Sequence, residues 1–261
     1  MRQDLNRKDA LSRDLPDLVY GRNAVLELLS SGRGADKIFL LREGDGILKK
    51  IGALAKEKGI PTGFADRERL DRMTGRARHQ GVVAVATGKA YVDLDELFAI
   101  AAEKGEDPFF VLADGVEDPH NLGALIRCMD GAGAHGIIIP KAGAASLSGA
   151  VMKASAGAAE HVAVCRVANL AFTVDKLKER GVWIYACEAD GEPYDQVDYH
   201  GPCAIVLGSE GKGVSRLIKE KSDFVVSLPM RGKVNSLNVS CAGAVILYEV
   251  LKQRSVKKAE R

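Results

Sequence analysis

From residue 109 onward, short apolar runs alternate with segments that have the periodicity of helices, and this alternation constrains the fold most. The apolar runs fall at residues 109–113, 136–140, 162–165, 183–187, 203–207 and 224–228. Between the first two runs, one helix face is indicated by the i, i+3, i+4, i+7 spacing of Leu122, Leu125, Ile126 and Met129. Strands of this kind, apolar throughout and separated by helices, are typical of a parallel sheet covered on both faces. The sequence therefore predicts an α/β domain over residues 108–261.

A second, smaller α/β unit is predicted ahead of this domain. Residues 37–41, 60–64 and 82–87 have the composition of strands, and residues 47–58 form a helical pattern that Gly59 closes. An apolar stripe at helical spacing precedes them at Ala24, Val25, Leu28 and Leu29. We expect a small domain over residues 18–89, preceded by a flexible polar tail over residues 1–17. Residues 90–107 are strongly acidic, and we interpret them as a partly helical acidic linker.

The distribution of charge is more informative than the formal net charge of +2. Residues 1–90 hold 18 lysines and arginines against 12 acidic residues, whereas residues 91–261 hold 19 against 23. Five arginines lie around one predicted helix and its exit: Arg67, Arg69, Arg72, Arg76 and Arg78. They could follow a phosphate backbone. Because acidic residues are interleaved with them, a solvated helix face is an equally good interpretation of this cluster.

Cysteine usage and hydropathy exclude several classes of protein. The five cysteines are Cys128, Cys165, Cys187, Cys203 and Cys241. Their wide spacing fits neither a disulfide framework nor a zinc site, so we interpret them as buried free thiols. No run approaches the ~18 to 20 apolar residues of a membrane span. We therefore expect a cytoplasmic protein that binds no metal and no membrane.

Two glycine-rich segments resemble nucleotide-binding motifs but differ in context or spacing. Gly131 to Gly136 spells G-x-G-x-x-G, yet it closes a helix and leads into a strand, which predicts a helix C-cap and disfavours a nicotinamide dehydrogenase. Gly208 to Gly213 leaves a strand and enters a helix, but it lacks the spacing of a phosphate-binding P-loop. The second segment is interpreted equally well as a generic turn or as a ligand site.

Polar residues near two helix starts also allow two interpretations. Asn121 precedes the helix with the apolar stripe, so its simplest role is that of an N-cap. This role does not explain Arg127, a guanidinium near the carboxyl end of a strand, where it suggests an anionic substrate group. The polar residues at 234–240 precede the C-terminal helix predicted over residues 241–254, and capping is again the simpler role.

Together these segments resemble the three signature motifs of the SpoU/TrmH branch of the SPOUT methyltransferases. The first is Asp-Pro-His-Asn-Leu-Gly at 118–123 with Arg127, and the second is Val-Leu-Gly-Ser-Glu-Gly at 206–211 with Gly213. The third runs from Leu-Pro-Met at 228–230 to Ser-Leu-Asn-Val-Ser at 236–240. The resemblance covers residues 109–254, with the motifs in family order. Residues 18–87 are more loosely similar to the substrate-binding domain of members that act on large-subunit ribosomal RNA, with landmarks at 19–25 and 79–82.

The resemblance implies a fold, a cofactor and a set of site residues. The expected fold is a parallel-sheet SPOUT domain with a deep trefoil knot, an exception to the rule against knotted chains. The expected cofactor is S-adenosylmethionine, held by Leu207, Gly208, Gly213, Leu228, Met230 and Leu237. The expected catalytic residues are Asn121, Arg127, Glu210, Ser236 and Asn238. The expected RNA-binding residues are Arg22, Arg67, Arg72, Arg76 and Arg78.

The resemblance also implies an activity, a partner and an oligomeric state. We expect 2′-O-ribose methylation of a guanosine in large-subunit ribosomal RNA by a homodimer formed through the C-terminal domain. A transfer RNA target is the main alternative, and a non-catalytic RNA-binding module is a further one. Family analogy favours Arg127 as the base, but a guanidinium with a pKa above ~12 is a poor proton acceptor, so the base is left open.

Overall fold

The computed structural model describes residues 18–30, 34–87 and 89–259. The predicted tail over residues 1–17 lies outside the described residues. The chain divides near Ala90 into two compact units, of which the first holds β1 to β4 together with the short stretch Ser146–Ala150, and the second holds the other described residues. None of the described helices is long and apolar enough to cross a membrane.

The first unit is a four-stranded sheet with helices on both faces. Its elements are β1 (Leu18–Tyr20), α2 (Arg22–Ser30), β2 (Ala35–Leu41), α3 (Gly46–Glu57), β3 (Thr62–Ala65), α4 (Arg67–Met73) and β4 (Val82–Ala86). The strand order is β1-β4-β2-β3, with β2 and β3 parallel and the other pairs antiparallel. Helices α2 and α3 pack on the face that carries Ile38 and Val82, and α4 packs on the face that carries Phe39 and Val83. The predicted small α/β unit is confirmed.

The second unit is a six-stranded parallel sheet, as the alternating pattern predicts. Its strands are β5 (Phe109–Asp114), β6 (Gly136–Pro140), β7 (Ala163–Val167), β8 (Trp183–Pro193), β9 (Cys203–Gly208) and β10 (Phe224–Ser227). Their order is β10-β8-β9-β5-β6-β7, and every recorded pair is parallel. From β5 the chain passes to β6 on one side, whereas β9 pairs with β5 on the other side. At such a point in a parallel sheet, a crevice is expected beyond the carboxyl ends of the two neighbouring strands, here β5 and β9.

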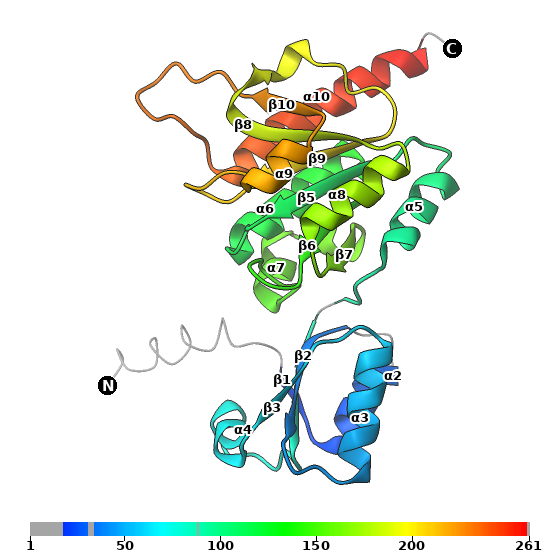
Figure 1. Cartoon of the computed structure of the whole chain (residues 1–261), viewed down its shortest axis with the longest axis vertical. Helices are drawn as coiled ribbons and strands as arrows, with labels where there is room; N and C mark the ends of the chain where they lie inside the picture. Colours follow the sequence, from blue (N-terminus) through cyan, green and yellow to red (C-terminus); the bar gives the residue numbers. More distant parts are fainter. Residues whose placement is uncertain (1–17, 31–33, 88, 260–261) are drawn as a thin grey trace. The chain divides into compact units, whose positions relative to one another are not determined.

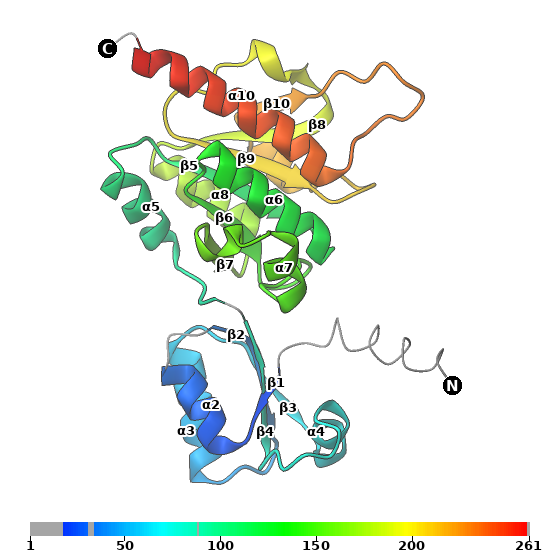
Figure 2. The ribbon, with the colours of Figure 1, turned by 180° about the vertical axis from the view of Figure 1, so that it is seen from behind.

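Helices cover both faces of this sheet. They are α5 (Leu94–Glu103), α6 (Pro119–Ala132), α7 (Gly149–Ala154), α8 (Leu170–Glu179), α9 (Arg216–Lys221) and α10 (Val239–Ala259), with 3-10 turns at Ala158–Glu160 and Tyr194–Gln196. One face carries α5, α8 and α9, and the other carries α6 and α10, as the front and back views show (Figures 1 and 2). Gly243 of α10 lies against Leu125 of α6 and Leu207 of β9, where a Cβ would come within 2.7 Å and 2.9 Å of their methyl carbons. The α/β fold with its parallel sheet is therefore confirmed, while the trefoil knot stays a prediction.

The segment expected to be an acidic linker is instead packed into the second unit. Leu97 of α5 is fully buried in the same core as Phe110, and the ring of Phe98 lies edge-on to that of Phe110 at 5.1 Å. Three of the acidic residues, Asp93, Asp95 and Glu96, lie at the start of the helix, where Asp93 and Glu96 make a reciprocal capping box. Helix capping therefore accounts for part of the acidic composition, while Glu103 ends the helix and Glu106 and Asp107 follow it.

The cysteines are free thiols, as expected, but they are less buried than expected. All five are free thiols, but only Cys165 and Cys203 are buried. Cys128 and Cys187 are half-buried, and Cys241 is exposed at the start of α10. The prediction of buried thiols was therefore wrong for Cys241, because small neighbours in sequence do not ensure cover in a helix that faces solvent.

Candidate active site

Asn121 lies inside the first turn of α6 and does not cap it. The cap is Asp118, whose Oδ1 accepts hydrogen bonds from the backbone N–H of His120 at 2.6 Å and of Asn121 at 3.3 Å. The prediction that Asn121 is the N-cap was therefore wrong, because an earlier aspartate followed by proline takes that position. The Asn121 side chain is left to point out of the helix, where its Nδ2 donates to Oε1 of Glu210 at 3.0 Å.

Asn238 connects the third motif to both of these residues. Its Nδ2 donates to Oδ1 of Asn121 at 2.8 Å and to Oε1 of Glu210 at 2.7 Å. Its Oδ1 accepts from the backbone N–H of Ser240 at 3.0 Å and of Cys241 at 3.4 Å. Asn238 therefore both caps α10 and holds the site together. We call Asn121, Glu210 and Asn238 the amide–carboxylate cluster.

A tight turn after β9 positions Glu210 in this cluster. The backbone groups of Ser209 and Gly213 bond to each other in both directions, at 2.9 Å and 3.1 Å. A Cβ on Gly208 would lie 2.0 Å from the carbonyl carbon of Gly213, so only glycine allows the two ends of the turn to approach this closely. The Glu188 carboxylate accepts from the Val214 N–H and fixes the exit of the turn. The turn is therefore held in one conformation by specific contacts and is not a generic surface loop.

A cavity of about 680 Å³ opens on one side of this turn, and we call it the loop cavity. It is lined by all six residues expected to hold the cofactor: Leu207, Gly208, Gly213, Leu228, Met230 and Leu237. Its outer wall is the segment 228–238, which has neither helix nor strand, so its backbone polar groups are not used in regular ladders. Cys187 also lines this cavity, and burial raises the pKa of its thiol to about 12, so it remains a neutral, unreactive side chain at pH 7.

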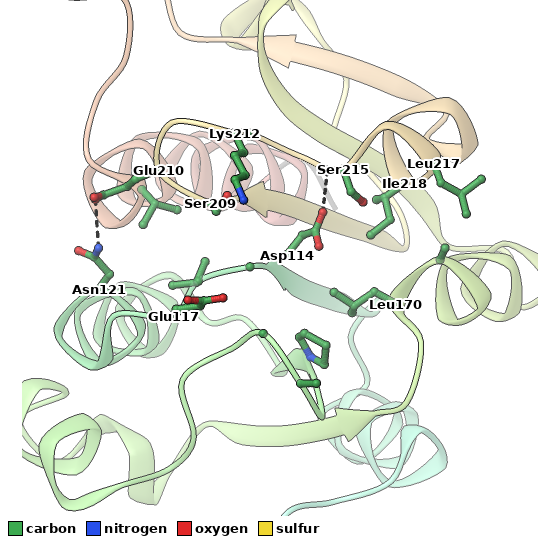
Figure 3. Close-up of a pocket in the computed structure, with 18 of the residues that line it drawn as sticks. Asp114, Glu117, Asn121, Leu170, Ser209, Glu210, Lys212, Ser215, Leu217 and Ile218 are labelled. Carbon is green, nitrogen blue, oxygen red and sulfur yellow. Dashed lines mark hydrogen bonds between the residues drawn. The ribbon is translucent and has the colours of Figure 1, made fainter.

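A second cavity, of about 720 Å³, opens on the other side of the turn, beyond the carboxyl ends of β5 and β9. We call it the acidic cavity, because the carboxylates of Asp114, Glu117, Asp118 and Glu210 line it together with a single lysine, Lys212. Figure 3 shows all of these residues but Asp118 with labels. Asp114 accepts from the N–H of Ser215 at 2.7 Å, which anchors the segment after the turn. Among the described residues, no group of three or more His, Cys, Asp or Glu side chains could hold a metal ion.

The structure brings together most, but not all, of the expected catalytic residues. Ser236 is exposed and lines the loop cavity beside Asn238. Arg127 lines neither cavity and is exposed on α6. It follows Asn121 by six residues, which turns its side chain by roughly 240° around the helix axis from that of Asn121. Arg127 is therefore the one expected catalytic residue that lies outside the site in a single chain.

Sequence reasoning overlooked several polar residues of the two cavities. Asp114 and Glu188 each occur where a run of apolar strand residues gives way to polar ones, and Glu117 directly precedes the first motif. Because the carboxyl ends of parallel strands share one edge of a sheet, this placement was a usable signal. Lys212 gave no comparable signal, since a lysine in a glycine-rich turn is common on protein surfaces.

The expected RNA-binding arginines of the first unit differ in how far they are already paired. Arg22 forms an ion pair with Asp45 at 2.8 Å and its Nε donates to the carbonyl of Gln80 at 3.1 Å. Arg72 pairs with Glu68 one helical turn away at 2.9 Å. The remaining three are exposed on or just after α4: Arg67, Arg76 and Arg78. The structure therefore makes these three more available to an external phosphate than Arg22 is.

Comparison with known proteins assigns both units to the family that their sequence motifs resemble. Residues 108–248 match the SpoU rRNA Methylase family, and residues 18–92 match the family described as RNA 2′-O ribose methyltransferase substrate binding. The chain is 46% identical over 241 residues to YacO of Bacillus subtilis (strain 168), which is named as a TrmH family tRNA/rRNA methyltransferase. That match covers 92% of this chain and 96% of YacO.

Solved structures agree on the fold. The SpoU methyltransferase AviRb from Streptomyces viridochromogenes, in complex with AdoMet, superposes with a TM-score of 0.59 at 24% identity and covers 94% of this chain and 93% of its own. The A. aeolicus TrmH/SpoU tRNA modifying enzyme has a TM-score of 0.55 at 30% identity and covers 63% of this chain and 85% of its own. From the matches to both units and the identity to a full-length relative, the chain belongs to the SpoU/TrmH family of RNA methyltransferases.

Proposed function

We propose that this enzyme transfers a methyl group from S-adenosylmethionine to the ribose 2′-oxygen of a guanosine in large-subunit ribosomal RNA. The observation that carries this proposal is the amide–carboxylate cluster. It joins side chains from three motifs, up to 117 residues apart in sequence, at the rim of the loop cavity. Such long-range convergence of polar side chains beside a cavity is what a catalytic site requires.

The loop cavity fits S-adenosylmethionine, the methyl donor of the family. Its volume of about 680 Å³ lies within the range of small-molecule sites. Gly208 lets the turn close so tightly that main chain lines the cavity, and Leu207, Leu228 and Leu237 give apolar walls for the adenosyl group. When bound, the cofactor supplies an electrophilic methyl group on a sulfonium centre. A cavity lined by backbone and apolar side chains suits this large, partly apolar molecule.

The residues of this chain contribute mainly by orientation. The Asn238 amide is fixed at both ends, by the first turn of α10 and by Asn121 with Glu210, so it cannot rotate freely. Orientation of reacting groups can supply ~7 to 11 kcal/mol in favourable systems, far more than a single hydrogen bond. We assign Asn121, Glu210 and Asn238 to holding the ribose, Ser236 to the substrate side of the loop, and Arg127 to a substrate phosphate.

The first unit is assigned to RNA binding. It matches the substrate-binding family over residues 18–92, and its surface carries Arg67, Arg76 and Arg78 exposed in one region of the chain. This domain is our reason for ranking ribosomal RNA first. A transfer RNA target is the second candidate, favoured by the 30% identity to a tRNA modifying enzyme that covers 63% of this chain.

The C-terminal unit is also assigned to homodimer formation. Val245 and Tyr248 lie on the outer side of α10 and are 39% and 51% exposed, an apolar surface at the helix that pairs with α6. Arg127 is exposed on α6 itself. A second subunit docked against these two helices would bring new groups toward Arg127, which a single chain leaves outside both cavities.

The activity is tested by mapping the methylated nucleoside. Deproteinised ribosomal and transfer RNA are incubated with labelled S-adenosylmethionine, digested, and analysed by mass spectrometry. We expect 2′-O-methylguanosine from large-subunit ribosomal RNA. Label that appears only in transfer RNA, or on a base and not on ribose, would replace the proposed target.

The role of Arg127 is tested in the same assay. Arg127→Ala should lose at least about 100-fold in methyl transfer while cofactor binding measured by calorimetry is unchanged. Lys176→Ala is the matched control, because it removes an exposed cation from α8 on the other face of the sheet. Wild-type activity in Arg127→Ala would remove this residue from the mechanism.

A further inference from the structure

Of the six residues assigned to the cofactor, only Gly213 lines the acidic cavity, yet this cavity is as large as the loop cavity. The two cavities share the turn after β9, and the residues that line both are Ser209, Glu210, Lys212, Gly213 and Val239. A molecule in the acidic cavity would thus lie across one turn of chain from the cofactor. The amide–carboxylate cluster stands at this shared wall, because Asn121 lines the acidic cavity and Asn238 lines the loop cavity.

Most of the carboxylates in the acidic cavity already have a structural task. Asp114 accepts from the Ser215 N–H, Asp118 caps α6, and Glu210 accepts from two amides. Glu117 is different: it is exposed, and no described residue forms a hydrogen bond or an ion pair with it. Its carboxylate is directed into the cavity (Figure 3).

Lys212 is the matching group of opposite charge. It too is exposed and has no partner among the described residues, and it lines the acidic cavity as well as the loop cavity. The two charged groups therefore face one cavity without pairing with each other. Apolar side chains form part of the wall, among them Val116, Leu170 and Ile218, which are buried to within 5% exposure. This combination suits a flat ligand with apolar faces and an edge that has both donors and acceptors.

We propose that the acidic cavity binds the guanine base of the target nucleoside, with Glu117 accepting from its N1–H and N2–H groups and Lys212 donating to O6. This inference rests on the proposed methylation of RNA and names the group that selects its substrate. Guanine is the one standard base with two adjacent donors on its pairing edge, and a carboxylate accepts both in a bidentate arrangement. With the base there, its ribose would lie at the amide–carboxylate cluster beside the loop cavity.

The charges of the cavity disfavour two other kinds of ligand. Four carboxylates against one lysine repel a phosphate or another anion. A divalent cation is disfavoured because the described carboxylates are not arranged as a metal-binding group. A neutral base with a donor-rich edge is compatible with both facts.

The test compares guanosine with inosine, which keeps O6 and N1–H but lacks the N2 amino group. The full-length enzyme, saturated with S-adenosylhomocysteine, is titrated with each nucleoside and with adenosine by ligand-detected NMR. We expect guanosine to bind about tenfold more tightly than inosine, the effect of removing one hydrogen bond to the base edge, and adenosine to bind most weakly. Glu117→Gln should reduce the guanosine-to-inosine ratio to near one.

Lys212→Met gives a different signature that a merely structural role would not produce. Both nucleosides keep O6, so this variant should weaken both equally and leave their ratio unchanged. Glu179→Gln, the same chemical change at the far end of α8, is the matched control and should leave guanosine binding unchanged. Binding of S-adenosylhomocysteine by each variant reports that it is folded.

The outcomes separate this inference from the proposed function. Equal binding of the three nucleosides, or a guanosine preference that survives Glu117→Gln, would overturn the base site even if RNA is methylated normally. Absence of guanosine binding at millimolar concentration to the cofactor-loaded enzyme would overturn it as well. If the unmodified enzyme binds guanosine as expected but methylates no RNA, the proposed reaction would be overturned and the base site would not.

Discussion

Some residues of this enzyme have two structural roles at once, and Asn238 is the clearest example. Its Oδ1 caps α10, and its Nδ2 donates to the other two members of the amide–carboxylate cluster. From the sequence alone, an asparagine at this position is compatible with either the capping role or the site role. For Asn121 the two roles were alternatives, and the presence of Asp118 three residues earlier decides between them. Local rules identify which residues can cap a helix, but they do not show which polar groups from distant segments meet.

Asn238→Asp separates the two tasks. Aspartate keeps an Oδ1 that caps α10, but it loses both donor bonds and places a second carboxylate beside Glu210. We expect methyl transfer to fall by about 100-fold while thermal stability changes little. Asn238→Ala, which also loses the cap, should in addition lower the free energy of unfolding by about 1 kcal/mol. An Asn238→Asp enzyme with wild-type turnover would show that the cluster does not orient the reacting groups.

At the scale of elements, buried strands were predictable and irregular segments were not. The six strands of the second unit were found because each contains a continuous apolar run that parallel packing requires, although β8 continues past its predicted end at residue 187 through a polar stretch to Pro193. The segment 228–238 has no periodicity from which a path can be derived, although it forms a wall of the loop cavity. The start of α5 was interpreted wrongly as a linker, because the residues of its capping box, Asp93 and Glu96, are acidic.

The junction between α6 and β6 contains a buried histidine that predicts a pH dependence. The Nδ1 of His135 accepts from the Phe109 N–H at 3.0 Å, and burial holds the pKa of its imidazole below the ordinary 6.5. The unfolded chain therefore binds a proton more readily than the folded chain does. Stability contributed by neutral His135 is complete above pH 6.5 and is lost as the pH falls from 6.5 toward the lowered pKa.

His135→Asn tests this dependence. Asparagine can offer an oxygen to the Phe109 N–H but does not titrate, so urea unfolding should become less dependent on pH between 6.5 and 5. At pH 7.5 the variant should be less stable by about 1 to 2 kcal/mol, because a smaller side chain fills the buried site less well. Equal slopes of stability against pH in the two proteins would show that His135 does not govern this range.

At the scale of the whole molecule, the excess of positive charge and the match to a substrate-binding family fall in the same part of the sequence. The excess of lysine and arginine lies in residues 1–90, and residues 18–92 match the substrate-binding family. Charge and resemblance together predict an RNA-binding role for the first unit. The sequence could not distinguish Arg22, which is paired within its unit, from arginines free to reach a phosphate, because ion pairing depends on contacts between distant segments.

Salt dependence of RNA binding tests the exposed arginines. The triple variant Arg67→Ala, Arg76→Ala, Arg78→Ala should weaken binding and reduce the slope of log affinity against log salt by roughly 2 to 3, about 0.7 to 0.9 for each phosphate that is no longer neutralised. The control removes three exposed lysines of α3, Lys49, Lys50 and Lys56, and so changes the net charge equally. Similar slopes for both triple variants would indicate a diffuse charge effect and no defined phosphate site.

If Asn238 acts as proposed, its two roles link methyl transfer to a local opening of the fold. Asn238 precedes the first turn of a helix of 21 residues, and helix ends fray at a far lower cost in free energy than whole domains unfold. Each fraying event withdraws the oxygen that Ser240 and Cys241 need and frees the nitrogen that Asn121 and Glu210 need. We therefore expect methyl transfer to be lost when this one helical turn frays, at temperatures below those at which the sheet and its helices melt.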